Sequence, residues 1–102
     1  MVIRLKILNK IKILGITLFP FIFVRPSATD VTINHEKIHL QQQLELLVIP
    51  FYIIYGLDYI TGRFKGLNDY EAYRNIRFEK EAFKQEHNLQ YLKERKRYEY
   101  KK

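Results

Sequence analysis

The stretch 32-TINHEKIHLQQQLELL-47 decides the fold, because it predicts a helix that carries most of the polar chemistry of the chain. Asp30 and Thr32 are both suitable N-caps for this helix. Residues four apart on a helix lie on one face, so His35 and His39 can present two imidazole nitrogens to a single metal ion. The helix therefore predicts a metal site.

Glu36 follows the first of these histidines and completes an HExxH pattern. A carboxylate at this position can reach a water on the metal and accept its proton, which is the arrangement of zinc hydrolases. The alternative is a polar helix stripe in which Glu36 is paired with a lysine.

Length and composition restrict the class of protein. A chain of 102 residues has room for one domain with a modest core. With 47% hydrophobic and 15% aromatic residues it is too apolar to be disordered. It contains no cysteine, so disulfides and thiolate sites are excluded, and histidine and carboxylate must hold any metal.

The net charge of +7 is concentrated at the two ends. Residues 1–24 contain four basic residues and no acid, and residues 93–102 contain six basic and two acidic residues, a net +4. Basic ends can contact nucleic acid or an anionic membrane surface. No helix-turn-helix, finger or RNA-binding signature is present, so we expect no specific nucleic-acid partner.

Basic and apolar side chains alternate over residues 3–7 and 10–13, the period of a strand with one wet face, and an apolar stretch rich in β-branched and aromatic residues follows. We therefore expect a β-hairpin over residues 1–24 that turns near Asn9 and Lys10, although Ile3, Ile7 and Ile11 also fit a helical spacing. A cleaved signal peptide is not expected, since cleavage after Ala28 would place Pro26 where a small residue is needed.

A second apolar stretch covers residues 46–57. It is too short to span a bilayer, and a core helix bent at Pro50 is the expectation. A protein of this size has few other elements to cover so apolar a helix, so shallow membrane association is an alternative. We expect a cytoplasmic or membrane-peripheral location.

The rest of the chain predicts a turn over residues 61–66, a long amphipathic helix from about Asp69 to Arg95, and a fraying basic tail over residues 96–102. The expected fold is mainly α with a small N-terminal β-hairpin (α+β). It is a compact, minimal zincin-like single domain of about three helices, with the two central helices in residues 32–62.

The third metal ligand is expected on the long helix, where Glu79, Glu81, Glu86 and His87 are candidates. Glu79 and Glu81 are about 200° apart around the helix axis, so both cannot face one neighbour. Glu79 shares a largely apolar face, whereas Glu81 lies among polar residues and is expected to face water. A carboxylate on a core-facing stripe needs a partner, which favours Glu79 as ligand, with Glu81 as the alternative.

The segment 78-FEKEAF-83 downstream of HExxH resembles the E-x-E-A-D segment of gluzincin metallopeptidases. In that family the first glutamate, here Glu79, is the third zinc ligand. The chain also resembles minigluzincins and short bacterial HExxH proteins over roughly residues 15–92. The resemblance is specific only at the two motifs. One position departs: Phe83 stands where gluzincins carry an acid that orients the first histidine, so that support must come from Asn34, Glu86 or Asp69.

This resemblance implies a zinc-dependent peptidase in which His35, His39 and Glu79 hold Zn²⁺ and Glu36 is the general base. A peptide or protein substrate would add as a strand along residues 17–24. Tyr70, Tyr73, Arg74 and His87 are candidates to stabilise the oxyanion, and helical steps place Tyr73 nearest to Glu79. The alternatives are a non-catalytic structural protein and a small membrane-peripheral or partner-binding protein.

Overall fold

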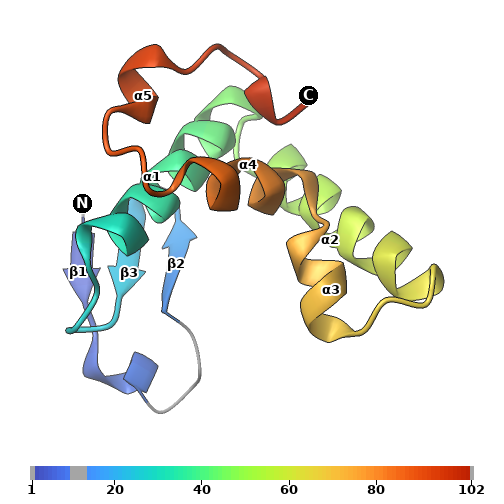
Figure 1. Cartoon of the computed structure of the whole chain (residues 1–102), viewed down its shortest axis with the longest axis horizontal. Coiled ribbons are helices and arrows are strands. Elements are labelled where there is room, and N and C mark those ends of the chain that lie inside the picture. The colour runs from blue at the N-terminus through green and yellow to red at the C-terminus, as the bar shows by residue number, and fades with distance from the viewer. Residues whose placement is uncertain (1, 10–13, 102) are drawn as a thin grey trace.

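The N-terminal part of the chain forms a three-stranded sheet in the order β1-β3-β2 (Figure 1). The structure is a computed structural model that describes residues 2–9 and 14–101. Strand β1 (Val2–Arg4) pairs in parallel with β3 (Phe21–Val24), and β3 pairs antiparallel with β2 (Gly15–Leu18). Strand β2 is therefore an edge strand.

The expected hairpin position is wrong. Residues Lys6–Asn9 form a 3₁₀ helix, and Lys10 lies outside the described residues. The hairpin is instead formed by β2 and β3, with Phe19 and Pro20 between them. Proline cannot donate a ladder hydrogen bond, so it suits this turn and not a strand.

The described residues form five α-helices, which confirms the mainly α fold with a small N-terminal sheet but exceeds the expected three helices. The helices are α1 (Asp30–Glu45), α2 (Ile49–Phe64), α3 (Asp69–Arg74), α4 (Arg77–Gln85) and α5 (Tyr91–Glu94), and a 3₁₀ turn follows at Glu99–Lys101. Helix α1 contacts β2, β3 and α4, and thus lies at the centre of the domain (Figure 1).

The start of α1 and the junction between α1 and α2 differ from the expectation. The N-cap of α1 is Thr29, one residue before Asp30 and three before Thr32. The expected bend at Pro50 is absent, because two separate helices meet at 115° and Pro50 lies in the first turn of α2. A proline is tolerated there since the first turn needs no N–H donor.

The predicted helix over residues 69–95 is wrong, because it is divided into α3, α4 and α5. Between α3 and α4 the backbone of Ile76 is extended, and its side chain is fully buried. Asp58 of α2 accepts a hydrogen bond from the Arg77 backbone N–H and thereby caps α4. Burial of Ile76 and this cap favour a new helix over continuation of the old one.

The expected fraying after residue 95 is also wrong for the residues described. The Tyr100 ring packs against Phe78, with ring centroids 4.8 Å apart. Phe51, Ile76, Phe78 and Tyr100 form one cluster of the core. The C-terminal segment therefore completes the core.

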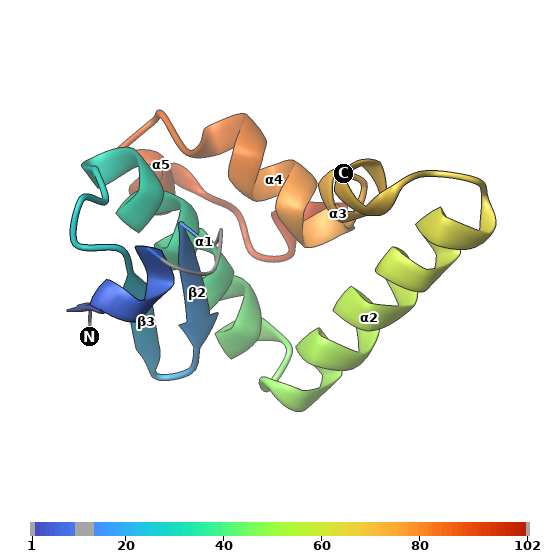
Figure 2. The ribbon, with the colours of Figure 1, turned by 90° about the horizontal axis from the view of Figure 1, so that it is seen from below.

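Helix α2 extends away from the sheet (Figure 2). Within the described residues no single helix is long and apolar enough to cross a membrane, and α1 and α2 meet that criterion of length and composition only as a bent pair.

Candidate metal centre

The inner face of α1 is polar. Six of its seven buried residues carry polar side chains: Asn34, His35, Glu36, His39, Gln42 and Gln43. Such groups are costly to bury without hydrogen bonds. Every buried polar side-chain atom among the described residues has a partner. Helix α1 thus gathers polar side chains on one face, and other elements must supply hydrogen-bond partners for them.

Helix α4 places Glu79 against both histidines of α1. Its Oε1 lies 3.0 Å from His35 Nε2 and 2.9 Å from His39 Nε2, and the two Nε2 atoms are 3.2 Å apart. All three residues are buried, with at most 6% of each exposed. Three donor atoms therefore converge on one point.

This geometry suits a metal ion. Two imidazoles and a carboxylate are a common donor set for zinc, and tetrahedral bonds of 2.0–2.1 Å would separate the donors by about 3.3 Å. The observed separations of 2.9–3.2 Å need to open by only a few tenths of an ångström. His35, His39 and Glu79 thus form a buried group that could hold a metal ion.

The charges in this group reinforce one another. Burial alone would raise the pKa of Glu79, but the positive charge of His39 and hydrogen bonds from His35, His39 and Tyr55 hold it well below its usual range. Burial alone would lower the pKa of His39, yet the Glu79 carboxylate raises it to about 9. The site consequently favours a negative carboxylate facing a cation.

The other ring nitrogen of each histidine is also bound. Glu86 Oε1 lies 2.8 Å from His35 Nδ1, and Gln42 Oε1 lies 2.8 Å from His39 Nδ1. Contacts of this kind fix ring orientation at metal sites.

Of the three groups considered to replace the missing acid at Phe83, only Glu86 contacts His35. The Asn34 amide binds backbone carbonyls of residues 85, 86 and 88. Asp69 is paired with Arg63 and accepts from Tyr59. The Phe83 ring itself packs edge-on against the His35 ring, with centroids 4.6 Å apart.

The prediction that Glu81 faces water is wrong. Glu81 is 7% exposed, is ion-paired with Arg95, and accepts hydrogen bonds from Gln42 and Tyr91. Burial would raise its pKa, but these partners lower it. Glu79 and Glu81 both reach α1, at different turns, because the C-terminal segment covers the side of α4 expected to be solvated. Glu81 is not part of the His35, His39 and Glu79 group.

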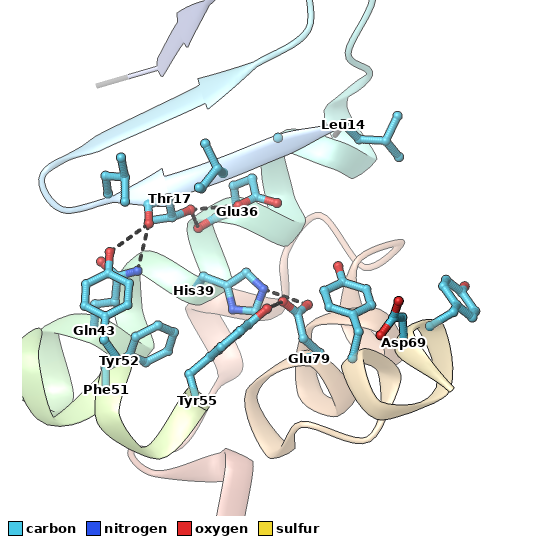
Figure 3. Close-up of a pocket in the computed structure, with 15 residues that line it drawn as sticks. Leu14, Thr17, Glu36, His39, Gln43, Phe51, Tyr52, Tyr55, Asp69 and Glu79 are labelled. Atoms are coloured by element: carbon cyan, nitrogen blue, oxygen red, sulfur yellow. Dashed lines mark hydrogen bonds and ion pairs between the residues drawn. The ribbon is translucent and has the colours of Figure 1, made fainter. Parts of the chain in front are cut away.

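A cleft of about 940 Å³ opens beside this group (Figure 3). Its walls come from β2 and all of α1 to α4, and its polar floor includes Glu36, His39 and Glu79. Thr17 Oγ1 on the edge strand lies 2.9 Å from both Glu36 Oε1 and the Glu36 backbone carbonyl oxygen, so its one hydroxyl proton is shared between these two acceptors of the same residue. A substrate in the cleft would contact Glu36, the candidate metal ligands His39 and Glu79, and the edge strand.

Two of the four candidate oxyanion donors, Tyr70 and Tyr73, line the cleft; Arg74 and His87 are not among its lining residues. The Arg74 guanidinium lies 3.8 Å from the centroid of the Phe83 ring, and the His87 side chain is 80% exposed. Burial and the nearby Glu79 and Glu36 charges raise the pKa of Tyr73, which keeps its hydroxyl a donor.

Sequence reasoning missed Tyr55, whose hydroxyl donates a 2.6 Å hydrogen bond to Glu79 Oε2 (Figure 3). Tyr55 follows Phe51 by four residues, which places it on the same face of an apolar helix. A tyrosine on a buried face needs a partner for its hydroxyl, and this spacing is the feature of the sequence that indicates Tyr55. Gln42 was missed too, although it continues the His35 and His39 face at the next helical step of three.

The chain shows no match to a protein-family model, to a curated protein or to a solved structure. The geometry of the site is therefore the basis for a function.

Proposed function

We propose that this protein is a zinc-dependent peptidase of gluzincin type. The observation that carries the proposal is the convergence of His35, His39 and Glu79 beside a cleft that is lined by His39, Glu79 and Glu36. When bound, a zinc ion would lower the pKa of water and polarise a carbonyl group.

Each residue of the site has a defined part. His35, His39 and Glu79 would hold the ion. Glu36, held by Thr17, accepts a proton from the attacking water and passes it to the leaving amine. Tyr73 donates a hydrogen bond to the oxyanion, and Tyr55 holds Glu79 in place.

No strand among residues 2–9 and 14–101 pairs with the outer edge of β2, which supports a peptide substrate. Leu14 pairs with Arg25 through the Arg25 N–H, and alternation along the strand turns the peptide groups of Gly15 and Thr17 away from β3. The Thr17 carbonyl is already bound by Gln43 and Tyr52, which leaves the Gly15 groups and the Thr17 N–H for an extended peptide.

The test combines metal analysis with one matched pair of variants. We expect one zinc per chain, lost in His35→Ala or His39→Ala. Glu36→Gln should keep the zinc but lose hydrolysis of an unstructured protein such as casein. Absence of zinc after titration of the metal-free protein would contradict the proposal, and loss of zinc in Glu36→Gln would contradict the role of Glu36.

A second candidate function, peripheral contact with a lipid bilayer, is supported by the outer face of α2. Five apolar residues on this face are 49–88% exposed: Ile49, Ile53, Leu57, Ile60 and Phe64. They follow one another at steps of three or four, so they form one stripe that could lie in a membrane interface. Co-sedimentation with liposomes of anionic and of neutral lipid, at low and high salt, tests this contact. Protein that stays in the supernatant under all conditions would contradict it.

A further inference from the structure

The second histidine of the candidate metal site is linked to the C-terminal segment by a chain of buried hydrogen bonds. Gln42 Oε1 contacts His39 Nδ1, and Gln42 Nε2 donates to Glu81 Oε1 at 2.9 Å. Glu81 in turn is held by the Arg95 guanidinium, which has 2% of its side chain exposed. The path crosses from α1 to α4 to the segment after α5.

The chemistry of this chain allows only one direction for the Gln42 amide. Its nitrogen lies 3.1 Å from the Phe78 carbonyl oxygen as well as near the Glu81 carboxylate, and both of these groups can only accept. The amide NH₂ must face them, so the amide oxygen must face His39. An amide oxygen can only accept, so His39 carries a proton on Nδ1.

A proton on Nδ1 leaves Nε2 as the nitrogen with the free lone pair in the neutral ring. His39 Nε2 is the atom that lies beside Glu79 and His35. The network therefore selects the tautomer that can bind a metal at this site.

We propose that Gln42, Glu81 and Arg95 form a positioning relay that holds His39 in its metal-binding tautomer, so that the C-terminal segment sets the metal affinity of the site. This inference rests on the metal site of the proposed function, and it does not require that the protein hydrolyses peptides. None of the three relay residues contacts the metal or the substrate in this assignment.

Arg95 supplies its own control, because it binds two buried glutamates. It donates to Glu45 Oε2 at 2.5 Å as well as to Glu81. Glu45→Gln and Glu81→Gln each remove one charge from the same arginine, but only Glu81 contacts Gln42. A simple anchoring role for Arg95 predicts equal effects of the two variants, and the relay predicts unequal ones.

Two readouts are needed: zinc affinity by competition with a chromophoric chelator, and proton NMR of the cobalt(II)-loaded protein. In the parent protein we expect two slowly exchanging, strongly shifted ring N–H signals, one from each histidine. Gln42→Met and Glu81→Gln should weaken zinc binding by about 10- to 100-fold, the usual effect of losing such support. Both variants should also speed exchange of the His39 signal, whereas Glu45→Gln should keep affinity and both signals.

A double variant separates the relay from a loss of folding. In Gln42→Glu/Glu81→Gln the carboxylate at position 42 accepts from His39 and the amide at position 81 donates to it, with one buried negative charge as before, while the Phe78 carbonyl loses its donor as it does in Gln42→Met. We expect slower exchange and tighter zinc binding than in Glu81→Gln alone. Equal affinity of Glu45→Gln and Glu81→Gln, or a parent-like His39 signal in Gln42→Met, would overturn the relay. A parent protein that binds zinc but hydrolyses nothing would overturn only the peptidase proposal, and one that binds no zinc would overturn both.

Discussion

Helices α1 and α2 are equally long, with 16 residues each, yet they bury opposite kinds of side chain. Helix α1 turns histidine, glutamate and glutamine side chains inward, whereas α2 turns a stripe of isoleucine, leucine and phenylalanine outward. The difference shows that hydropathy alone does not decide which face of a helix is buried. Polar groups can be buried where other elements supply partners, and α1 has such partners in β2, α4 and the C-terminal segment.

The largest expected effect comes from removing a partner of this buried polar layer. Arg95→Met would leave Glu45 and Glu81 without their cation in a buried position, which should lower the free energy of unfolding by about 3–5 kcal/mol. Urea denaturation of the metal-free protein measures it. Arg77→Met, which breaks the half-exposed pair with Asp58, is the control and should lower the same quantity by at most about 1 kcal/mol. Equal losses in the two variants would remove the distinction between α1 and the surface.

A smaller effect is expected for Tyr55, where α2 itself contributes a polar group to the interior. Tyr55→Phe removes a hydrogen bond to the charged Glu79, so it should destabilise the metal-free protein by about 1.5–3 kcal/mol. Tyr70→Phe alters a hydroxyl on the exposed side of α3 and should change stability by no more than about 0.5 kcal/mol. A silent Tyr55→Phe would mean that α2 takes no part in the site.

The cap that α2 provides for α4 should contribute about 1 kcal/mol, since Asp58 binds the first N–H of α4 and pairs with Arg77 at the surface. Burial would raise the pKa of Asp58, but Arg77 lowers it. A carboxylate with a lowered folded pKa stabilises the protein above its unfolded pKa of about 4. The stability difference between the parent protein and Asp58→Asn should therefore be complete above about pH 4 and shrink as the pH falls further. Thermal unfolding as a function of pH measures it.

The smallest effect on stability is expected for the outer stripe of α2. Leu57→Gln and Phe64→Gln change side chains that are 57% and 88% exposed. Each should therefore alter the free energy of unfolding by no more than about 0.5 kcal/mol. The pair should nevertheless abolish co-sedimentation with liposomes. Leu89→Gln, an apolar residue 49% exposed outside α2, is the matched control and should leave lipid binding unchanged. A large loss of stability in the stripe variants would show that this face packs against another part of a folded assembly.

Features that depend on local geometry could be predicted from the sequence. The shared face of His35 and His39 follows from helical spacing, and the mainly α fold follows from the long periodic segments. The environment of Glu81 could not be predicted, because its partner Arg95 follows after a break in the helix. The hydrogen bonds of Gln42 and Tyr55 likewise depend on residues of α4 that lie 24 to 39 residues away along the chain.

The division of residues 69–95 was missed for a similar reason. Helical periodicity continues through Ile76, but burial of that side chain and the Asp58 cap from α2 end one helix and begin another. At the N-terminus, alternation indicated strands, but it could not indicate that β1 would pair in parallel with β3. Strand pairing depends on the whole sheet, and the residues of one strand alone do not specify it.

The contacts that complete the histidine site also bear on the order of events in folding. His35 meets Glu79 and Glu86 across 44 and 51 residues, and Glu45 meets Arg95 across 50. Closing such long loops is entropically unfavourable, so these contacts form late, after local helices. A newly formed α1 thus holds both histidines and Gln42, but it lacks Glu79, the Glu86 support of His35, and Glu81, the partner of Gln42. A metal ion that binds to this group would therefore be captured tightly only at the end of folding, and it would then stabilise the whole domain at once.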